Sequence, residues 1–285
     1  MRAFLLGIVS LCLLVSTGTA AQMYGHLETE QLPPHLRDRG EGMPTSMFGT
    51  YVQKGQFLVY PFFEYYRDHN LEYAPDEFGQ TEDQDYRGKY EAFEGILFLS
   101  YGITDRLAIE IEGAIIKATL ETSPDDPSGL PVKLEESGVG DVEGQIRYRW
   151  NRERADFPEF FSYFETVGPT QDEGSLIGTS EWELKLGTGV VRGFSWGTMT
   201  ARVAVEYAVD AEDFALGEAA VEYLRRLSSH WRVYGGVEGT QDEASVVAEV
   251  QYHFSRHAFA KVNSGFGVTS KATDWAPEAG VLFSF

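Results

Sequence analysis

Hydrophobic and polar positions alternate along most of the chain. In the stretch VEGQIRYRW, residues 142–150, apolar residues and a glycine occupy one parity, and charged or polar residues occupy the other. A period of two predicts a β-strand, because successive side chains of a strand point to opposite faces. Gly138, Gly140 and Gly144 are spaced one residue wider than a dinucleotide-binding loop requires, and no helical pattern follows them. Gly138 and Gly140 are therefore predicted to be bend or bulge positions at the start of a strand.

Segments with this alternation recur at regular intervals, separated by turn-like breaks, as expected of an all-β chain. The predicted strands cover about 56–68, 89–101, 106–118, 138–150, 160–168, 179–192, 197–209, 214–226, 231–239, 244–254, 257–269 and 275–285. No segment after residue 21 has a helical period of comparable strength. The predicted fold class is therefore all-β, with about 12 strands.

The predicted connections alternate in length. Those at 102–106, 192–197, 228–230 and 255–257 are tight, whereas those at 70–88 and 120–137 are long and acidic. Short turns at one end and long loops at the other are typical of bacterial outer-membrane barrels, whose short turns are periplasmic. An even number of strands places both ends of such a barrel on the periplasmic side.

The end of the chain supports a membrane barrel. The segment PEAGVLFSF places Ala279, Val281, Phe283 and Phe285 on one face. It resembles the C-terminal signal that the barrel assembly machinery reads in outer-membrane proteins, with Phe285 as the terminal aromatic residue. A soluble β-sandwich that ends in a strand is the alternative. We predict a transmembrane antiparallel β-barrel in the cell outer membrane, with its apolar faces on the lipids and its polar faces in the lumen.

Aromatic residues of the apolar faces fall near the ends of the predicted strands. Tyr101, Tyr148, Trp150, Tyr252 and Phe254 are expected at the periplasmic interface, and Trp182 and Tyr207 at the outer one. Two such girdles are typical of barrels that span a membrane, because aromatic side chains favour the headgroup level.

The first 21 residues are predicted to be a secretory signal peptide. Arg2 precedes an apolar run from residue 3 to residue 15, and small residues end at Ala21. Cys12, the single cysteine, lies in that run and would be removed by cleavage. Residues 22–55 are polar and contain several prolines and glycines, and we expect a periplasmic N-terminal leader or a partial plug. Residues 56–285 are expected to form the barrel.

Composition and net charge limit the kinds of molecule that the protein is expected to bind. The formal net charge is −21, so nucleic acid is not an expected partner, because phosphate binding needs a basic surface. No apolar run of 18 residues follows the signal peptide, which excludes a helical membrane protein. The expected partners are outer-membrane lipids, the assembly machinery and small solutes. No cofactor is expected.

Two short motifs suggest a family. The segment YGITDRLAIEIEG is followed by GVGDVEGQIRYRW. This pairing resembles the family named for the MetA pathway of phenol degradation, a group of outer-membrane barrels, over about residues 56–285. The resemblance implies an outer-membrane barrel that passes hydrophobic compounds.

Charged residues of the polar parity are expected to line the lumen. They are Glu94, Glu110, Glu112, Asp141, Glu143, Arg147, Arg149, Glu181, Glu183, Lys185, Arg202, Glu206, Glu218, Glu222, Glu249, His253, Lys261 and Glu278. One interpretation is an ion-pair network that fills a narrow barrel. The other is a selectivity lining, since rings of charge determine which solutes pass through a pore.

Three strands depart from strict alternation and predict an apolar wall in the lumen. Both parities of 56–68 are apolar or aromatic, and the wall is assigned to Leu58, Tyr60, Phe62, Ile96 and Phe98. Either Phe160 and Phe164 or their neighbours Phe161 and Tyr163 are expected to join it. Such a wall could bind an apolar ligand. The alternative is that the segment 22–55 packs against it.

Catalytic and metal-binding motifs are absent from the sequence. The six histidines are scattered, with no H-E-x-x-H motif, and no G-x-S-x-G elbow occurs. The acidic loop segments lack EF-hand spacing. We expect no enzyme, but a channel or transporter for passive passage of small solutes, hydrophobic ones included. The alternative function is a structural or adhesive barrel whose lumen is filled by side chains and whose surface loops are acidic.

Overall fold

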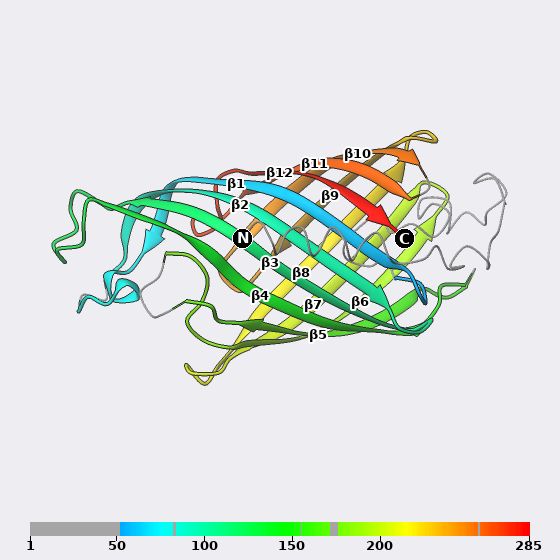
Figure 1. The fold of residues 1–285 in the computed structure, drawn as a ribbon, viewed down its shortest axis with the longest axis horizontal. Helices are drawn as coiled ribbons and strands as arrows, with labels where there is room; N and C mark the ends of the chain where they lie inside the picture. The colour runs from blue at the N-terminus through cyan, green and yellow to red at the C-terminus, as the bar shows by residue number, and fades with distance from the viewer. Residues whose placement is uncertain (1–51, 82–83, 155, 172–175, 256) are drawn as a thin grey trace, which may run out of the picture.

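The chain forms one closed antiparallel β-barrel of twelve strands (Figure 1). The computed structural model describes residues 52–81, 84–154, 156–171, 176–255 and 257–285. Each strand pairs with its neighbours in sequence, and the last strand closes the barrel against the first. The predicted fold class and strand number are confirmed. Within the described ranges, no helix has the length and apolar character needed to cross a membrane.

The strands agree in order with those predicted, and several differ in length. They are β1 (Phe57–Tyr73), β2 (Tyr86–Gly102), β3 (Leu107–Glu121), β4 (Lys133–Asn151), β5 (Glu159–Gly168), β6 (Glu183–Phe194), β7 (Gly197–Ala208), β8 (Asp213–Arg226), β9 (Trp231–Gly239), β10 (Ala244–Ser255), β11 (Ala258–Gly267) and β12 (Ala276–Ser284), with a 3-10 turn η4 (Pro75–Phe78) after β1. The predicted loops 70–88 and 120–137 are longer than the observed connections, because β1 to β4 continue beyond the residues whose apolar and polar side chains alternate. The extensions are paired strand to strand, and exposed ion pairs such as Lys89–Glu121, at 3.2 Å, cross between them.

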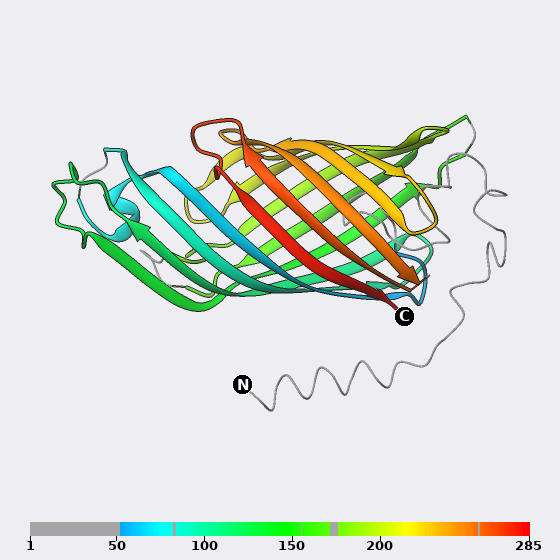
Figure 2. The same ribbon diagram turned by 90° about the horizontal axis from the view of Figure 1, so that it is seen from above.

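The barrel has two unlike ends. Short turns join β2 to β3, β6 to β7, β8 to β9 and β10 to β11 at the end where β1 begins and β12 finishes, which we call the turn end. The opposite end carries the extensions of β1 to β4 and the segment with η4, and we call it the loop end (Figures 1 and 2). Phe57 and Phe285 meet at the turn end through two backbone hydrogen bonds of 3.1 and 2.9 Å.

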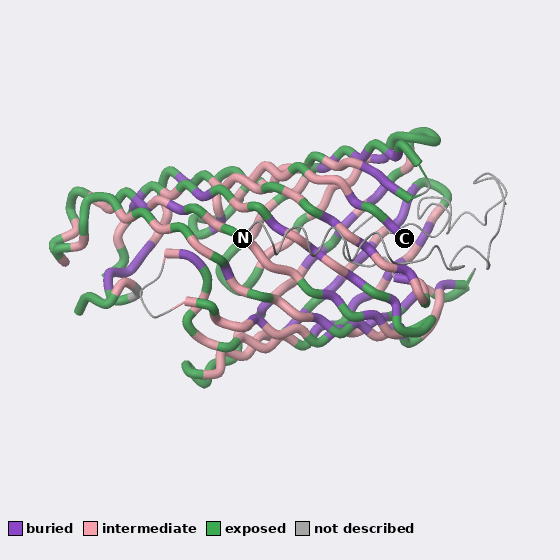
Figure 3. Tube along the Cα trace, in the orientation of Figure 1, coloured by how far each residue is buried: buried purple, intermediate pink, exposed green. Residues whose placement is uncertain are grey.

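Buried and exposed residues alternate along the strands (Figure 3). Many exposed strand positions carry large apolar side chains and many enclosed positions carry charged ones, so the barrel has a polar interior and an apolar outer face. On β3, Ile109 and Ile111 are 43 % and 50 % exposed, whereas Glu110 between them is buried. The outer face also carries exposed aromatic side chains near both ends, among them Trp150 at the turn end and Trp182 at the loop end. This distribution matches a barrel that spans a membrane.

The glycines before residue 142 allow a β-bulge. The register between β3 and β4 shifts where Gly113 opposes Val142 and Ile115 opposes Val139, which leaves Gly140 and its successor opposite a single residue. A Cβ on Gly140 would lie 2.5 Å from Cδ1 of Ile116, so no larger residue fits without a shift. The predicted bulge is confirmed at Gly140, whereas Gly138 pairs regularly with Ile116 and both glycines lie inside β4 and not at its start.

Residues before β1 pack against the turn end. Val52 is buried in a cluster with Leu58, Phe98 and Leu282, and the amide of Gly55 donates to the carbonyl of Gly102 at 2.7 Å. The predicted signal peptide, residues 1–21, and residues 22–51 of the predicted leader or plug lie outside the described residues. Their roles therefore stay predictions.

Candidate functional site

The barrel encloses a cavity of about 420 Å³. Its walls come from β1 to β5 and from β9 to β12, and we call it the lumen cavity. A volume of this size is within the range of small-molecule sites. It reaches from residues such as Glu243 and Thr273, near the loop end, to Phe98 and Leu282, near the turn end.

Acidic side chains dominate the lining of the lumen cavity. The carboxylates are Glu64, Glu110, Glu112, Glu143, Glu165, Glu238, Glu243, Glu249 and Glu278. The cationic side chains are Arg147 and Lys261. Nine acids against two bases give a formal surplus of seven negative charges. The field in such a low-dielectric cleft attracts cations and repels anions.

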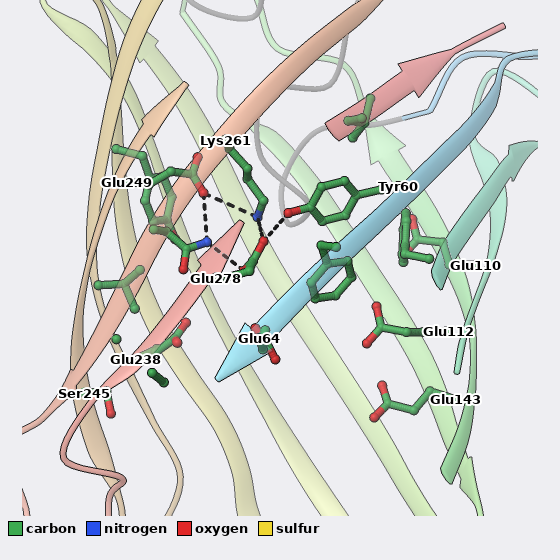
Figure 4. A pocket seen from close by; sticks show the side chains of 18 of the residues that line it. Tyr60, Glu64, Glu110, Glu112, Glu143, Glu238, Ser245, Glu249, Lys261 and Glu278 are labelled. Atoms are coloured by element: carbon green, nitrogen blue, oxygen red, sulfur yellow. Dashed lines mark hydrogen bonds and ion pairs between the residues drawn. The ribbon is translucent and has the colours of Figure 1, made fainter. Parts of the chain in front are cut away.

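One wall is a network centred on Lys261 (Figure 4). Its Nζ lies 3.0 Å from Oε1 of Glu278 and 3.4 Å from Oε2 of Glu249, and Nδ2 of Asn263 donates to Glu278 at 2.7 Å. The hydroxyl of Tyr60 donates to Glu278, and Nζ of Lys261 lies 4.8 Å from the centre of the Tyr60 ring. The network joins β1, β10, β11 and β12.

The opposite wall of the cavity carries carboxylates whose charge is less well balanced by cationic side chains. Glu112 and Glu143 are directly opposite one another on β3 and β4, and Figure 4 shows both pointing into the cavity. Among the described residues, no hydrogen bond or ion pair holds either side chain. Like charges directly opposite one another destabilise a sheet. Their position in the cavity therefore favours a role with a solute over a role in the fold.

Ion pairs fill the interior near the turn end. Arg147 Nη2 lies 3.1 Å from Oε2 of Glu110, and Arg149 Nη1 lies 3.5 Å from Oε2 of Glu159. All four side chains are buried. On β7 and β8, Arg202 forms ion pairs with Glu218 and the buried Glu222. These pairs and the cluster around Val52 narrow the lumen at this end.

Aromatic rings occupy the interior beside β6. Phe161 and Tyr163 are 1 % and 2 % exposed, whereas Phe160 and Phe164 face outward. Of the two aromatic pairs that the sequence left open, Phe161 and Tyr163 are therefore the pair that faces the lumen. A Cβ on Gly187 would overlap the ring of Tyr163, so the rings lie directly over glycines of β6.

The predicted charged residues fall into three groups. Those that line the lumen cavity are Glu110, Glu112, Glu143, Arg147, Glu249, Lys261 and Glu278. Those inside the barrel beyond the cavity are Glu94, Arg149, Glu183, Lys185, Arg202, Glu206, Glu218, Glu222 and His253. Asp141 and Glu181 instead bind loop backbone: Asp141 accepts from the amide of Thr179 at 2.5 Å, and Glu181 from that of Asp210 at 2.8 Å. Glu181 precedes β6, which begins four residues later than predicted.

The predicted apolar wall lies on one side of the interior. Leu58, Tyr60, Phe62, Ile96 and Phe98 all occupy the inward parity of β1 and β2, and Tyr60, Phe62 and Phe98 line the lumen cavity. Several lining residues were not predicted, namely Glu64, Glu165, Tyr234, Glu238 and Asn263. Glu64 has the same parity as Tyr60, and Glu165 the same parity as Tyr163, so fixing the parity of these strands would have identified both.

Metal ligands are not grouped in the described residues. Within the ranges that the structure describes, no three His, Cys, Asp or Glu side chains are arranged to hold a metal ion. The carboxylates of the lumen cavity are spread over its walls. Their arrangement fits a passage or a binding cavity better than a metal centre.

Comparisons with known proteins identify the fold. No protein-family model and no curated protein matches the sequence, so the resemblance to the MetA-pathway family stays a prediction. Among solved structures, the COG4313 outer membrane channel from Pseudomonas putida F1 is similar, with a TM-score of 0.63, 14 % identity, and coverage of 82 % of this chain and 97 % of that chain. The KdgM porin in complex with oligogalacturonate has a TM-score of 0.50 and 8 % identity, over 80 % of this chain and 99 % of that one. The chain therefore has the fold of outer-membrane channel barrels.

Proposed function

We propose that the protein is an outer-membrane channel through which small solutes pass passively. The observation that carries the proposal is the lumen cavity, which lies inside a closed barrel whose outer face is apolar. The similar solved structures, an outer-membrane channel and a porin, support a transport role over an enzymatic one. Export through the signal peptide 1–21 and assembly through the terminal Phe285 belong to the same proposal.

The charge of the cavity defines the solutes that it favours. Seven surplus negative charges lower the energy of a cation in the lumen and raise that of an anion. Glu112 and Glu143 face the cavity, and no cationic side chain in the described part of the chain lies within hydrogen-bonding distance of them. Cationic and neutral solutes are therefore expected to pass in preference to anions.

Neutral apolar solutes can contact a second, aromatic surface of the lumen cavity. Tyr60, Phe62 and Phe98 form one side of the cavity, and the rings of Tyr60 and Phe62 stack at a centroid distance of 4.5 Å. A flat apolar molecule gains by covering such a surface. Passage of hydrophobic compounds, as the resemblance to the MetA-pathway family implies, fits this wall.

The alternative function, a structural or adhesive barrel, is favoured by a specific observation. Buried ion pairs and the Val52 cluster occupy the interior at the turn end, which is the pattern of a filled lumen. A barrel closed in this way would conduct no ions until the turn end is opened. The loop end would then supply the function through its acidic surface.

Single-channel recording in planar bilayers distinguishes the two functions. The mature chain is compared with a variant that lacks residues 22–55. Stepwise currents from the intact protein are expected for an open channel, and currents that appear only after the deletion would identify the segment as a plug. Silence from both proteins would contradict the channel and favour the filled barrel.

A further inference from the structure

Four side chains that line the lumen cavity form one continuous row across the first four strands. Tyr60 on β1 lies directly opposite Phe98 on β2, and Phe98 lies opposite Glu112 on β3. Glu112 in turn lies opposite Glu143 on β4. Side chains that oppose one another on neighbouring strands have Cβ atoms about 5 Å apart. This acid–aromatic row therefore places two rings directly beside two carboxylates.

A second row, one step closer to the loop end, is apolar. Phe62 on β1 lies opposite Ile96 on β2, and Ile96 lies opposite Ala114 on β3. All three positions have the inward parity of their strands, and the Phe62 ring lies against the Tyr60 ring of the first row. The two rows together form an apolar surface on β1 and β2 that can cover one face of an aromatic ring. This surface ends where the carboxylates begin.

The Lys261 network on the opposite wall shows what two carboxylates beside a ring can bind. Nζ of Lys261 lies 3.0 Å from Glu278, 3.4 Å from Glu249 and 4.8 Å from the centre of the Tyr60 ring. One ammonium group thus pairs with two carboxylates and also contacts the face of an aromatic ring. Both contacts are strong where water is partly excluded. The acid–aromatic row has the same kinds of group, namely two carboxylates and neighbouring rings.

The row differs from the Lys261 network in the source of positive charge. In the ranges that the structure describes, neither Glu112 nor Glu143 forms an ion pair or a hydrogen bond. The basic side chains of nearby strands bind other carboxylates: Arg147 lies 3.1 Å from Glu110, and Lys185 lies 3.3 Å from Glu165. Charges held in a protein interior are costly unless they are paired. A solute that brings its own ammonium group therefore gains at this position.

We propose that the acid–aromatic row is a binding site for arylalkylammonium ions, which place their ring on Phe98 and its apolar neighbours and their ammonium group between Glu112 and Glu143. In 2-phenylethylammonium, two methylene groups separate the ring from the nitrogen. This length matches the single strand spacing, about 5 Å, between Phe98 and Glu112. The inference rests on the proposed function and deepens it, because it names a class of solute for the same cavity.

The first experiment compares three probes on the wild-type protein. Isothermal titration calorimetry of the mature chain in non-ionic detergent micelles measures the affinity for 2-phenylethylammonium, for neutral 2-phenylethanol and for ethylammonium, which has no ring. Titration of protein-free micelles gives the background. The arylalkylammonium ion is expected to bind at least about tenfold more tightly than the alcohol, because hydrogen bonds to carboxylates are stronger for an ammonium group than for a hydroxyl. Equal affinity for this ion and either of the other probes would overturn the site.

Two variants locate the site within the row. Glu112→Gln with Glu143→Gln keeps the size of both side chains and removes both charges, so binding of 2-phenylethylammonium is expected to weaken by at least about tenfold. Phe98→Leu removes a ring contact and is expected to weaken binding about threefold. The control, Glu121→Gln with Glu135→Gln, removes two exposed carboxylates at the loop end and is expected to keep the wild-type affinity.

A second readout separates the site from the channel. Potassium currents in planar bilayers test the proposed function without the probe, whereas calorimetry tests the site without conduction. Currents without binding of 2-phenylethylammonium would refute the site and leave the channel intact. Binding without currents would refute the channel and support the site. Unchanged affinity in the folded Glu112→Gln, Glu143→Gln variant would place the bound probe elsewhere and overturn the proposal.

Discussion

The ion pair between Arg147 and Glu110 gives the sharpest prediction for stability. The side chains are 2 % and 5 % exposed, Nη2 of Arg147 lies 3.1 Å from Oε2 of Glu110, and Gln145 accepts from the guanidinium at 3.0 Å. Arg147→Met would leave Glu110 buried with only a 3.4 Å hydrogen bond from Ser100. Breaking a buried pair by removing one partner costs about 3–5 kcal/mol, because the remaining charge is uncompensated.

The double variant separates the charge effect from packing. Glu110→Gln together with Arg147→Met removes both charges, so its loss of unfolding free energy is expected to be smaller than that of Arg147→Met alone. Urea unfolding of the refolded barrel in detergent micelles, followed by tryptophan fluorescence, measures each difference. A loss below about 0.5 kcal/mol for Arg147→Met, the range of neutral surface changes, would refute the reasoning. Additive losses in the double variant would refute the coupling.

Three further predictions follow from the interior, the cavity and the loop end. Gly187→Val forces a tyrosine ring out of place and is expected to cost about 1–3 kcal/mol in urea unfolding, whereas Gly95→Ala, which meets no atom within 4 Å, is expected to be neutral. Glu112→Gln removes an uncompensated carboxylate from the cavity, so the reversal potential in a KCl gradient is expected to shift toward zero, and an unchanged potential would place the charge off the conduction path. The backbone N–H of His69 donates to Asp274 at 3.0 Å, and this bond and the ring contact hold the pKa of that carboxyl below its ordinary value. The contact is therefore present above the ordinary pKa of an aspartate and is lost as the pH falls through the lowered pKa of Asp274. Protease cleavage of the loop after β11 is expected to rise below about pH 4. An unchanged cleavage rate would contradict the prediction.

The fold could be predicted from the sequence because the outer face and the lumen of the barrel carry residues of opposite polarity at alternate positions. The segment 142–150 has an apolar parity and a polar parity, and β4 contains it with the predicted orientation. The loop-end extensions of β1 to β4 were missed because both faces of these strand segments are largely polar and the alternation disappears. Their pairing depends on partners such as Lys89 and Glu121, which are distant in sequence.

The site could be predicted in part. The parity of Glu110 and Glu112 follows from the isoleucines between and beside them. Glu64 shares the parity of the predicted wall residues Tyr60 and Phe62 but was not assigned to the lumen. The role of Asp141 was not predictable, because a bulge at Gly140 redirects it to the loop that contains Thr179.

The most direct test of the channel is single-channel recording of the mature protein in a planar bilayer under a KCl gradient. The surplus of carboxylates in the lumen cavity predicts stepwise currents whose reversal potential has the sign of cation preference. Absence of conductance both in the mature protein and after deletion of residues 22–55, or a reversal potential with the sign of anion preference, would contradict the account.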